Sequence, residues 1–351
     1  MKNRSIVIII AALCMVIMGA CFSSWDGSGD EGTIVINLGN GGARYVGVGP
    51  GEETAGEGPA AVEYTIILTS PGGEIISGQF KDTTTVSFSV QPGFWTVAVR
   101  VNDEGALQSY GETSVEVQAG ETVPALIKMR DLITVKGDWK DLKTAIEGAQ
   151  AAELVMLTSE TLIVNDSIEI PNGRSITLLA KNPVTIIKGG TFTNSMFRVP
   201  RGSSLTLGVA GGMEENGEIT FNGNNNGDSS LIYVGTTRIN SGSNTGDGGK
   251  LTMYDGVILT NNRATISDRG GAVVVQGGTF IMNGGTISGN TAVQGGGVRV
   301  LSGTFTKTGG TIYGSNGDEN KNTATSGNGH AVYFDVDRIS KNETLGPDDN
   351  L

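Results

Sequence analysis

Three copies of one segment follow each other near the C-terminal end, and this repeat constrains the fold more than any other feature of the chain. The copies are GGKLTMYDGVILTNN (248–262), GGTFIMNGGTISGNT (277–291) and SGTFTKTGGTIYGSN (302–316). We align them in two apolar columns, the first made of Leu251, Phe280 and Phe305 and the second of Ile258, Ile287 and Ile312. Members of the first column are 29 and then 25 residues apart, which is the length of one coil of a repeat solenoid.

Each repeat contains three short apolar strands separated by glycine turns. The third strand of each repeat is supplied by GGAVVVQ (270–276), GGGVRVLS (295–302) and GHAVYF (329–334). Alternation points Phe280 and Met282 to one face of their strand. So short a strand cannot bury its apolar side alone, and each coil must stack on its neighbours. The sequence therefore predicts an all-β fold with a right-handed parallel β-helix.

Asparagines at the end of the repeats fall in register. Asn261 and Asn290 occupy one position, and Ser315 or Asn316 follows in the third copy. Stacked asparagines form hydrogen-bonded ladders between neighbouring coils. Asparagine also tolerates the left-handed backbone of a tight turn. Both interpretations remain open for these residues.

The first twenty residues have the organisation of an export signal. Lys2 and Arg4 precede an apolar run from Ile6 to Met18, which is too short for a stable membrane-spanning helix. The run ends in Met18-Gly19-Ala20-Cys21, which resembles the bacterial lipoprotein box. That resemblance implies removal of residues 1–20 and lipidation of Cys21 by acyl chains such as palmitate. An ordinary cut near Ala20, or an uncleaved anchor, is the alternative.

The cysteine count fits the lipoprotein interpretation. The only other cysteine, Cys14, lies inside the signal, so Cys21 has no partner for a disulfide in the mature chain. Several acyl chains on one residue anchor a protein firmly without a transmembrane segment. Phe22 differs from the aspartate that retains lipoproteins in the inner membrane. We expect an outer-membrane protein at the cell surface, with the periplasmic face as the alternative.

Composition divides the mature chain into three parts. Residues 21–32 are small, polar and acidic and predict a flexible tether. Residues 33–131 contain short alternating strands between Gly, Pro and Asp turns, which predict an antiparallel β-sandwich. The strands are expected at 33–38, 63–69, 84–90, 94–101, 114–117 and 123–129. In style this part resembles the prealbumin-like (Ig-like) and carboxypeptidase-regulatory-like modules of secreted bacterial proteins.

The β-helix is expected over residues 132–351. It begins with an amphipathic helix over 138–150, for which Asp138 or Asp141 is the N-cap. A helix followed by many short strands resembles the start of pectin-lyase-like β-helices, which implies that the helix caps the open end of the coil. At about 25 residues per coil we expect roughly eight coils. Residues 335–351 are expected to cap the other end.

Two short motifs in the repeats resemble those of polymorphic outer membrane proteins, which are autotransporter adhesins. Gly270-Gly271-Ala272-Val273 resembles the GGAI motif, and Phe280-Ile281-Met282-Asn283 resembles FxxN. The other repeats keep the spacing and lose part of each motif. The resemblance covers residues 248–334 and implies adhesion or binding along the β-helix.

A polysaccharide lyase or hydrolase is the main alternative, because many such enzymes share the β-helix fold. Their sites place carboxylates of neighbouring coils on one sugar ring. Aligned by coil, Asp255 falls opposite Gly284 and Asp268 opposite Val293, so no column of acids forms. Only loop residues such as Asp228 and Asp247 could converge. His330 is expected to be a turn residue, and neither a catalytic set, a cofactor motif nor metal-ligand spacing is found.

Three tyrosines are the candidate binding residues. Tyr233, Tyr254 and Tyr313 could stack on a glycan, whereas aromatic residues on strands more commonly serve packing. Lys307 occupies the column of Met253 and Met282, so either it points inward or the register shifts there.

The net charge limits the partners. The chain has a formal net charge of −12, which disfavours nucleic acid as a partner because nucleic acid requires a basic surface. We therefore expect a non-catalytic lipoprotein that is attached to the membrane through Cys21. Its other partner would be a glycan or a protein, bound along a face of the β-helix. A structural periplasmic lipoprotein is a further alternative.

Overall fold

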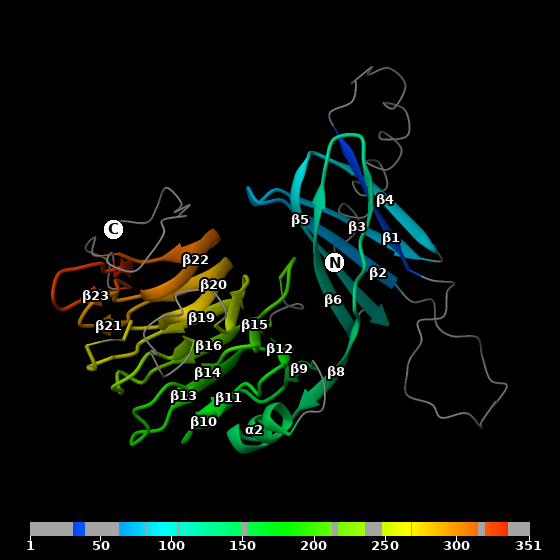
Figure 1. Ribbon diagram of the computed structural model, residues 1–351. Coiled ribbons are helices and arrows are strands. Elements are labelled where there is room, and N and C mark those ends of the chain that lie inside the picture. The colour runs from blue at the N-terminus through cyan, green and yellow to red at the C-terminus, as the bar shows by residue number, and fades with distance from the viewer. Residues whose placement is uncertain are drawn as a thin grey trace, which may run out of the picture.

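The structure is a computed structural model that describes residues 31–38, 63–81, 83–103, 106–148, 153–212, 217–235, 248–267, 269–314 and 320–335. Cys21 and the predicted signal peptide lie outside these residues, as do nearly all of the predicted tether and C-terminal cap. The described chain consists almost entirely of strands. A smaller unit of mostly antiparallel strands is followed by long parallel stacks (Figure 1).

The N-terminal unit has two sheets. Its strands are β1 (Gly32–Asn37), β2 (Glu63–Thr69), β3 (Ile75–Lys81), β4 (Thr85–Val90), β5 (Gly93–Asp103), β6 (Ala106–Val117) and β7 (Thr122–Pro124). One sheet has the order β4-β1-β7 and the other the order β3-β2-β5-β6. Ile34 of β1, Ile66 of β2 and Trp95 of β5 belong to one buried cluster that both sheets share. Burial of each such side chain stabilises the fold by about 1.5–3 kcal/mol.

Four details differ from the predicted strands of this unit. Strand β3 was not predicted, and β6 starts well before Ser114, where its strand was expected. The strand predicted over 123–129 ends at Pro124, and the last ladder bond to β1 is the one that the Ala125 amide donates to the carbonyl oxygen of Val35, at 2.9 Å. Strand β7 also pairs parallel to β1, not antiparallel.

Strand β8 (Arg130–Val135) joins the two parts of the structure. Arg130 and Asp131 pair antiparallel with β6, whereas Leu132–Val135 pair parallel with β9 (Glu153–Leu157). One continuous strand therefore belongs both to the N-terminal unit and to the parallel stacks.

Helix α2 (Trp139–Glu147) follows β8. Asp138 is the N-cap, because its Oδ1 accepts hydrogen bonds from the amides of Lys140 (2.9 Å) and Asp141 (3.2 Å). The Asp141 carboxylate accepts in return from the Asp138 amide, at 3.0 Å. The helix buries Trp139, Leu142 and Ile146 in the same cluster as the strands. It ends earlier than predicted, at Glu147.

The remaining strands form three parallel stacks, which agree with the predicted all-β class and with a parallel β-helix. Stack A contains β8, β9, β12 (Ser175–Ala180), β15 (Ser204–Leu207) and β18 (Lys250–Met253). Stack B contains β10 (Thr161–Val164), β13 (Val184–Lys188), β16 (Ile219–Asn222) and β19 (Val257–Thr260). Stack C contains β11 (Ile168–Glu169), β14 (Phe197–Val199), β17 (Ile232–Gly235) and β24 (Val332–Phe334).

Two long strands run through all three stacks. These are β20 (Val273–Ser288) and β22 (Val298–Ile312), which bend at glycines and contribute one segment to each stack. The short strands β21 (Thr291–Ala292) and β23 (Thr323–Ala324) form a separate pair. Within the described residues stack A holds seven strands, fewer than the eight coils expected. The reason is that some coils are much longer than 25 residues, since Leu205 pairs with Leu251.

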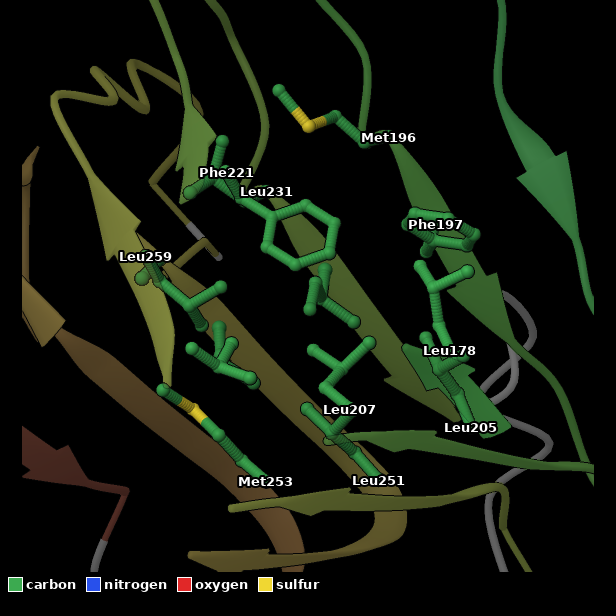
Figure 2. Packing of buried hydrophobic residues seen from close by; sticks show 14 of the residues in the cluster. Leu178, Met196, Phe197, Leu205, Leu207, Phe221, Leu231, Leu251, Met253 and Leu259 are labelled. Atoms are coloured by element: carbon green, nitrogen blue, oxygen red, sulfur yellow. The ribbon is translucent and has the colours of Figure 1, made fainter. Parts of the chain in front are cut away.

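The interior between the stacks is filled by columns of apolar side chains. Figure 2 shows Leu207 and Met253 of stack A, Phe221 and Leu259 of stack B and Phe197 of stack C directed toward one another. The rings of Phe197 and Phe221 lie 5.9 Å apart, edge to face. The predicted inward column of Leu251, Phe280 and Phe305 is confirmed by its register and burial.

The second predicted column is wrong by one residue. Leu259, not Ile258, pairs with Ile287, which in turn pairs with Ile312. The turn after Met253 contains one residue more than the turn after Met282, and a slip of one residue reverses the faces of a strand. Leu259 is accordingly buried and Ile258 is only half-buried.

The asparagine ladder exists, but of the predicted residues only Asn290 is shown in it. Asn262 takes the place of Asn261, Asn322 is the third member, and Ser315 and Asn316 lie outside the described residues. Asn262, Asn290 and Asn322 are all buried. The Oδ1 atom of Asn290 accepts from the Asn262 amide at 3.1 Å, and the Oδ1 atom of Asn322 accepts from the Asn290 amide at 2.9 Å. Asn261 is exposed and adopts the left-handed conformation, with φ of 53°. The same one-residue difference in the turn moves the ladder from Asn261 to Asn262.

Lys307 points inward, as one of the two interpretations of the sequence required. Lys307 of β22 pairs with the inward residue Met282 of β20, and its side chain is buried. The register of the column therefore holds through Lys307.

Replacing Asn290 by Ala should lower the free energy of unfolding by about 3 kcal/mol, because buried backbone groups lose their partners. The Nδ2 atom of Asn290 donates to the carbonyl oxygens of Leu259 and Ser288, at 3.0 and 2.9 Å. Urea denaturation followed by circular dichroism measures the loss. The matched control is Asn261→Gly, which keeps the left-handed turn and should change stability by less than about 0.5 kcal/mol. An equal loss in both variants would contradict the ladder.

Candidate functional site

The outer face of stack A is covered by the N-terminal unit. Their contact is a mainly apolar cluster, contributed on one side by Ile67, Ala98, Leu107 and Tyr110 and on the other by Leu154, Met156, Leu179, Val209, Ala210 and Tyr254. Two arginines add polar contacts. Arg100 donates to the carbonyl oxygen of Gly212 at 2.9 Å, and Arg130 donates to the hydroxyl of Thr177 at 2.7 Å. The outer face of stack A is therefore covered from β9 to β18.

Tyr254, one of the three candidate binding residues, lies inside this contact. Its hydroxyl donates to Oε2 of Glu112 at 3.1 Å, and the hydroxyl of Tyr110 donates to the same oxygen at 2.6 Å. Burial, followed by the charge of Glu112, raises the pKa of both tyrosines. The ring of Tyr254 is buried, so of the two interpretations of this residue the structure agrees with packing and not with glycan stacking.

Tyr233, the second candidate, is also buried, with an exposed fraction of 2%. The guanidinium groups of Arg198 and Arg269 lie 5.4 and 4.9 Å from the centre of its ring, and its hydroxyl donates to Oε1 of Gln276. Burial raises the pKa of Tyr233, while the two arginines act in the opposite direction. The groups that contact this ring are arginines from the chain itself, so the structure agrees with the packing alternative for Tyr233 as well.

The outer face of stack C continues this arrangement of charged and aromatic residues. Arg198 pairs with Glu169 on the neighbouring strand, with 3.7 Å between nitrogen and oxygen. Further along the stack the guanidinium group of Arg299 lies over the ring of Tyr333, at 5.4 Å, and also donates to the carbonyl oxygen of Ser267. The polar groups on this face are thus largely engaged with one another.

Tyr313, the third candidate, keeps part of its surface in solvent. Its amide donates to the carbonyl oxygen of Ile287 at 3.0 Å, and its own carbonyl oxygen accepts from Asn322 at 2.7 Å. It follows the inward residue Ile312, so alternation directs its ring to the outer side of stack B.

The outer face of stack B carries two aligned columns of uncharged residues, which together we call the threonine face. The first column is Thr161, Thr185, Thr220, Ile258, Thr286 and Thr311. The second column is Ile163, Ile187, Asn222, Thr260 and Ser288. Parallel strands lie about 4.8 Å apart, so each row presents its methyl and hydroxyl groups at a regular step.

The threonine face is accessible along most of its length. Thr161 and Thr311 at its two ends are exposed, and Ile163 has an exposed fraction of 55%. The other members are half-buried, apart from the buried Ser288. Neighbouring rows also contact each other, since Ser288 and Thr260 place their hydroxyl oxygens 3.5 Å apart.

Sequence reasoning missed this face, although a signal for it existed. The tripeptides Thr161-Leu162-Ile163, Thr185-Ile186-Ile187 and Thr220-Phe221-Asn222 each place one inward apolar residue between two outward ones. The sequence alignment covered only the last three coils and assigned Ile258 to the interior, so the outward column could not be seen.

The candidate acids and the histidine that lie within the described residues take part in structural hydrogen bonds. The described residues contain no set of three or more His, Cys, Asp or Glu side chains close enough to hold a metal ion. Asp255 caps a turn by accepting from the Gly285 amide at 3.1 Å, and Asp228 accepts from the hydroxyl of Thr265. His330 lies in a turn, where its Nδ1 accepts from the Ala324 amide at 3.2 Å. Asp247 and Asp268 lie outside the described residues.

Replacing Tyr254 by Phe should lower the free energy of unfolding by about 1–3 kcal/mol, because Glu112 loses one of two hydroxyl donors in a buried contact. Chemical denaturation measures this loss. The control is Tyr333→Phe, which keeps the ring beneath Arg299 and should leave stability nearly unchanged. A Tyr254→Phe variant as stable as the control would show that the hydrogen bond contributes nothing to the contact.

The comparisons with known proteins return no match. No family model, no curated protein and no solved structure is significantly similar to the chain. Among the described residues, no helix has the length and apolarity required to cross a membrane. The function must therefore be argued from the geometry of the exposed faces.

Proposed function

We propose that this chain is a non-catalytic lipoprotein of the outer-membrane surface that binds an extended, neutral glycan along its threonine face. In this proposal the parallel stacks are a right-handed β-helix, α2 caps its first coil, and the N-terminal unit is a β-sandwich spacer. The threonine face is the observation that carries the binding function, because it is regular, uncharged and accessible.

The chemistry of the threonine face suits a polysaccharide. Each threonine offers a hydroxyl that can donate and accept, and a methyl group that can contact the C–H side of a sugar ring. Because the side chains stand on hydrogen-bonded strands, little conformational entropy is lost when a ligand binds. An overall net charge of −12 and a face without cations disfavour acidic polymers.

Tyr313 extends the proposed site at one end. Its partly exposed ring is placed beside the last rows of the threonine face, where it can stack on a sugar. Of the three tyrosines predicted from the sequence, this is the one that stays in the proposal. No observation favours the lyase or hydrolase alternative over binding, or a structural role in the periplasm.

The combined variant Thr185→Lys, Thr220→Lys and Thr286→Lys should weaken glycan binding at least about tenfold, which corresponds to about 1.4 kcal/mol. Long ammonium side chains would block the rows without disturbing the inward columns. The measurement is binding to an array of neutral and acidic polysaccharides, followed by calorimetry with whichever polysaccharide binds.

The matched control also introduces three lysines, at exposed strand positions of the N-terminal unit: Thr85→Lys, Ser87→Lys and Ser114→Lys. It should bind like the wild type. Equal binding by both variants, or exclusive binding of acidic polymers, would contradict a site on the threonine face. Depolymerisation of a bound polysaccharide by the wild type would instead establish an enzyme.

The Cys21→Ser variant should lose both lipid and membrane attachment. In bacteria fed labelled palmitate, the wild type should become labelled and sediment with the outer membrane, while the variant should remain unlabelled. Protease added to intact cells should degrade the wild type if it faces outward. Labelling of the variant would exclude Cys21 as the lipid site, and full protection of the wild type would place the protein in the periplasm.

A further inference from the structure

Lys188, the last residue of β13, is a charged residue that turns into the interior. It is buried, with an exposed fraction of 1%. Its Nζ atom lies 2.9 Å from Oδ1 of Asn262 and 3.2 Å from the carbonyl oxygen of Ser229. Both acceptors are uncharged, whereas an ammonium group has three N–H donors to satisfy. These surroundings suit a neutral nitrogen better than an ammonium ion.

Two glycines make room for the contact between the side chains. A Cβ atom on Gly227 would lie 2.7 Å from Nζ of Lys188 and 3.3 Å from Oδ1 of Asn262. A Cβ atom on Gly223 would lie 2.5 Å from the same Oδ1. Any larger residue at either position would push the two side chains apart. The sequence therefore keeps open the space in which Lys188 and Asn262 meet.

The amide group of Asn262 is held in one orientation. Its Nδ2 atom donates to the carbonyl oxygens of Ser229, at 3.0 Å, and of Gly271, at 2.6 Å. Its Oδ1 atom consequently faces Lys188. Because a C=O bond is about 1.2 Å long, Nζ lies within about 4 Å of the carbonyl carbon, Cγ. A movement of about 1 Å brings it to the distance from which nucleophiles attack.

The surroundings of Lys188 also favour the neutral form of its amine. Burial lowers the pKa of Lys188 to about 8, although the charge of Asp228 acts in the opposite direction. With this pKa about one molecule in ten carries the neutral amine at pH 7, and the neutral amine is the nucleophilic form. The partner, Asn262, supplies a carboxamide carbon as the electrophile.

We propose that Lys188 and Asn262 form an intramolecular isopeptide bond. The lone pair of Nζ attacks Cγ of Asn262, and the bond between Cγ and Nδ2 breaks. One proton passes from Nζ to the departing nitrogen, which leaves as ammonia. The reaction needs no oxidant, reductant or second substrate. The product is a neutral secondary amide whose single N–H is placed to donate to the carbonyl oxygen of Ser229.

The position of the pair in the asparagine ladder explains why the bond would form only there. Asn290 and Asn322 meet another asparagine or the backbone, whereas Asn262 meets an amine. The bond would join the coil of β13 to the coil of β19, across the intervening coil of β16. It is independent of the proposed glycan site and of the lipid anchor.

Peptide mapping by mass spectrometry tests the proposal on the purified full-length protein. Trypsin does not cut after an acylated lysine, so residues 182–198 should appear joined to residues 251–263. The mass of the product should be the sum of the two peptides minus one ammonia. Fragmentation should place the link at Lys188 and Asn262. Recovery of 182–188, 189–198 and 251–263 only as separate peptides would overturn the proposal.

Two variants identify the atoms involved. Lys188→Arg and Asn262→Ala should each abolish the joined peptide, whereas the neighbouring control Asn261→Gly should keep it. Loss of ammonia from asparagine–glycine sequences elsewhere in the chain would lower the mass but could not join two peptides. The wild-type map requires no variant and decides the question even if a variant fails to fold.

The pH dependence of stability provides a second readout. If Lys188 stayed a free amine, its pKa would be about 8 when folded and near the ordinary 10.5 when unfolded. The unfolded chain would then bind more protons between these values, and stability would rise with pH from about 8 to about 10.5. An amide does not titrate, so wild type and Lys188→Met should change in parallel over this range. A rise confined to the wild type would overturn the bond.

Discussion

The structure depends on the register of side chains between successive parallel strands. The interior is closed only because Leu207, Met253 and their equivalents fall on the inner side of every coil. Since side chains alternate along a strand, an error of one residue would turn an apolar column toward water. The turns between strands must therefore absorb all differences in length. They do so after Met253, where one extra residue shifts the following positions from Ile258 and Asn261 to Leu259 and Asn262.

Features that depend only on alternation within one element could be predicted from the sequence, whereas features that depend on the register between strands could not. The column of Leu251, Phe280 and Phe305, the N-cap Asp138 and the inward Lys307 all follow from alternation within a strand or from the first turn of a helix. Such features depend on neighbours in the chain. Leu259 and Asn262 depend on the length of a turn, which the alignment of repeats did not resolve.

The candidate site shows the same division. The burial of Tyr254 is set by Glu112 and Tyr110, which lie more than a hundred residues earlier in the chain. The burial of Tyr233 depends on Arg198 and Arg269 from other coils. The residues next to each tyrosine in the sequence do not indicate these contacts. The threonine face, in contrast, can be recognised from local tripeptides in which one apolar residue stands between two outward ones. The alignment of only the last coils did not reveal it.

The shared strand β8 has a mechanical consequence. Because β8 is hydrogen-bonded both to β6 and to β9, the two parts of the molecule are joined by a continuous ladder and not by a linker. The contacts of Tyr110 and Arg130 with the stacks add further restraint. These contacts hold strand β6 of the N-terminal unit against stack A. A force applied to the parallel stacks would reach the N-terminal unit through the short β6–β8 ladder of two residue pairs, so the side-chain contacts around Tyr110 would share the load with the backbone.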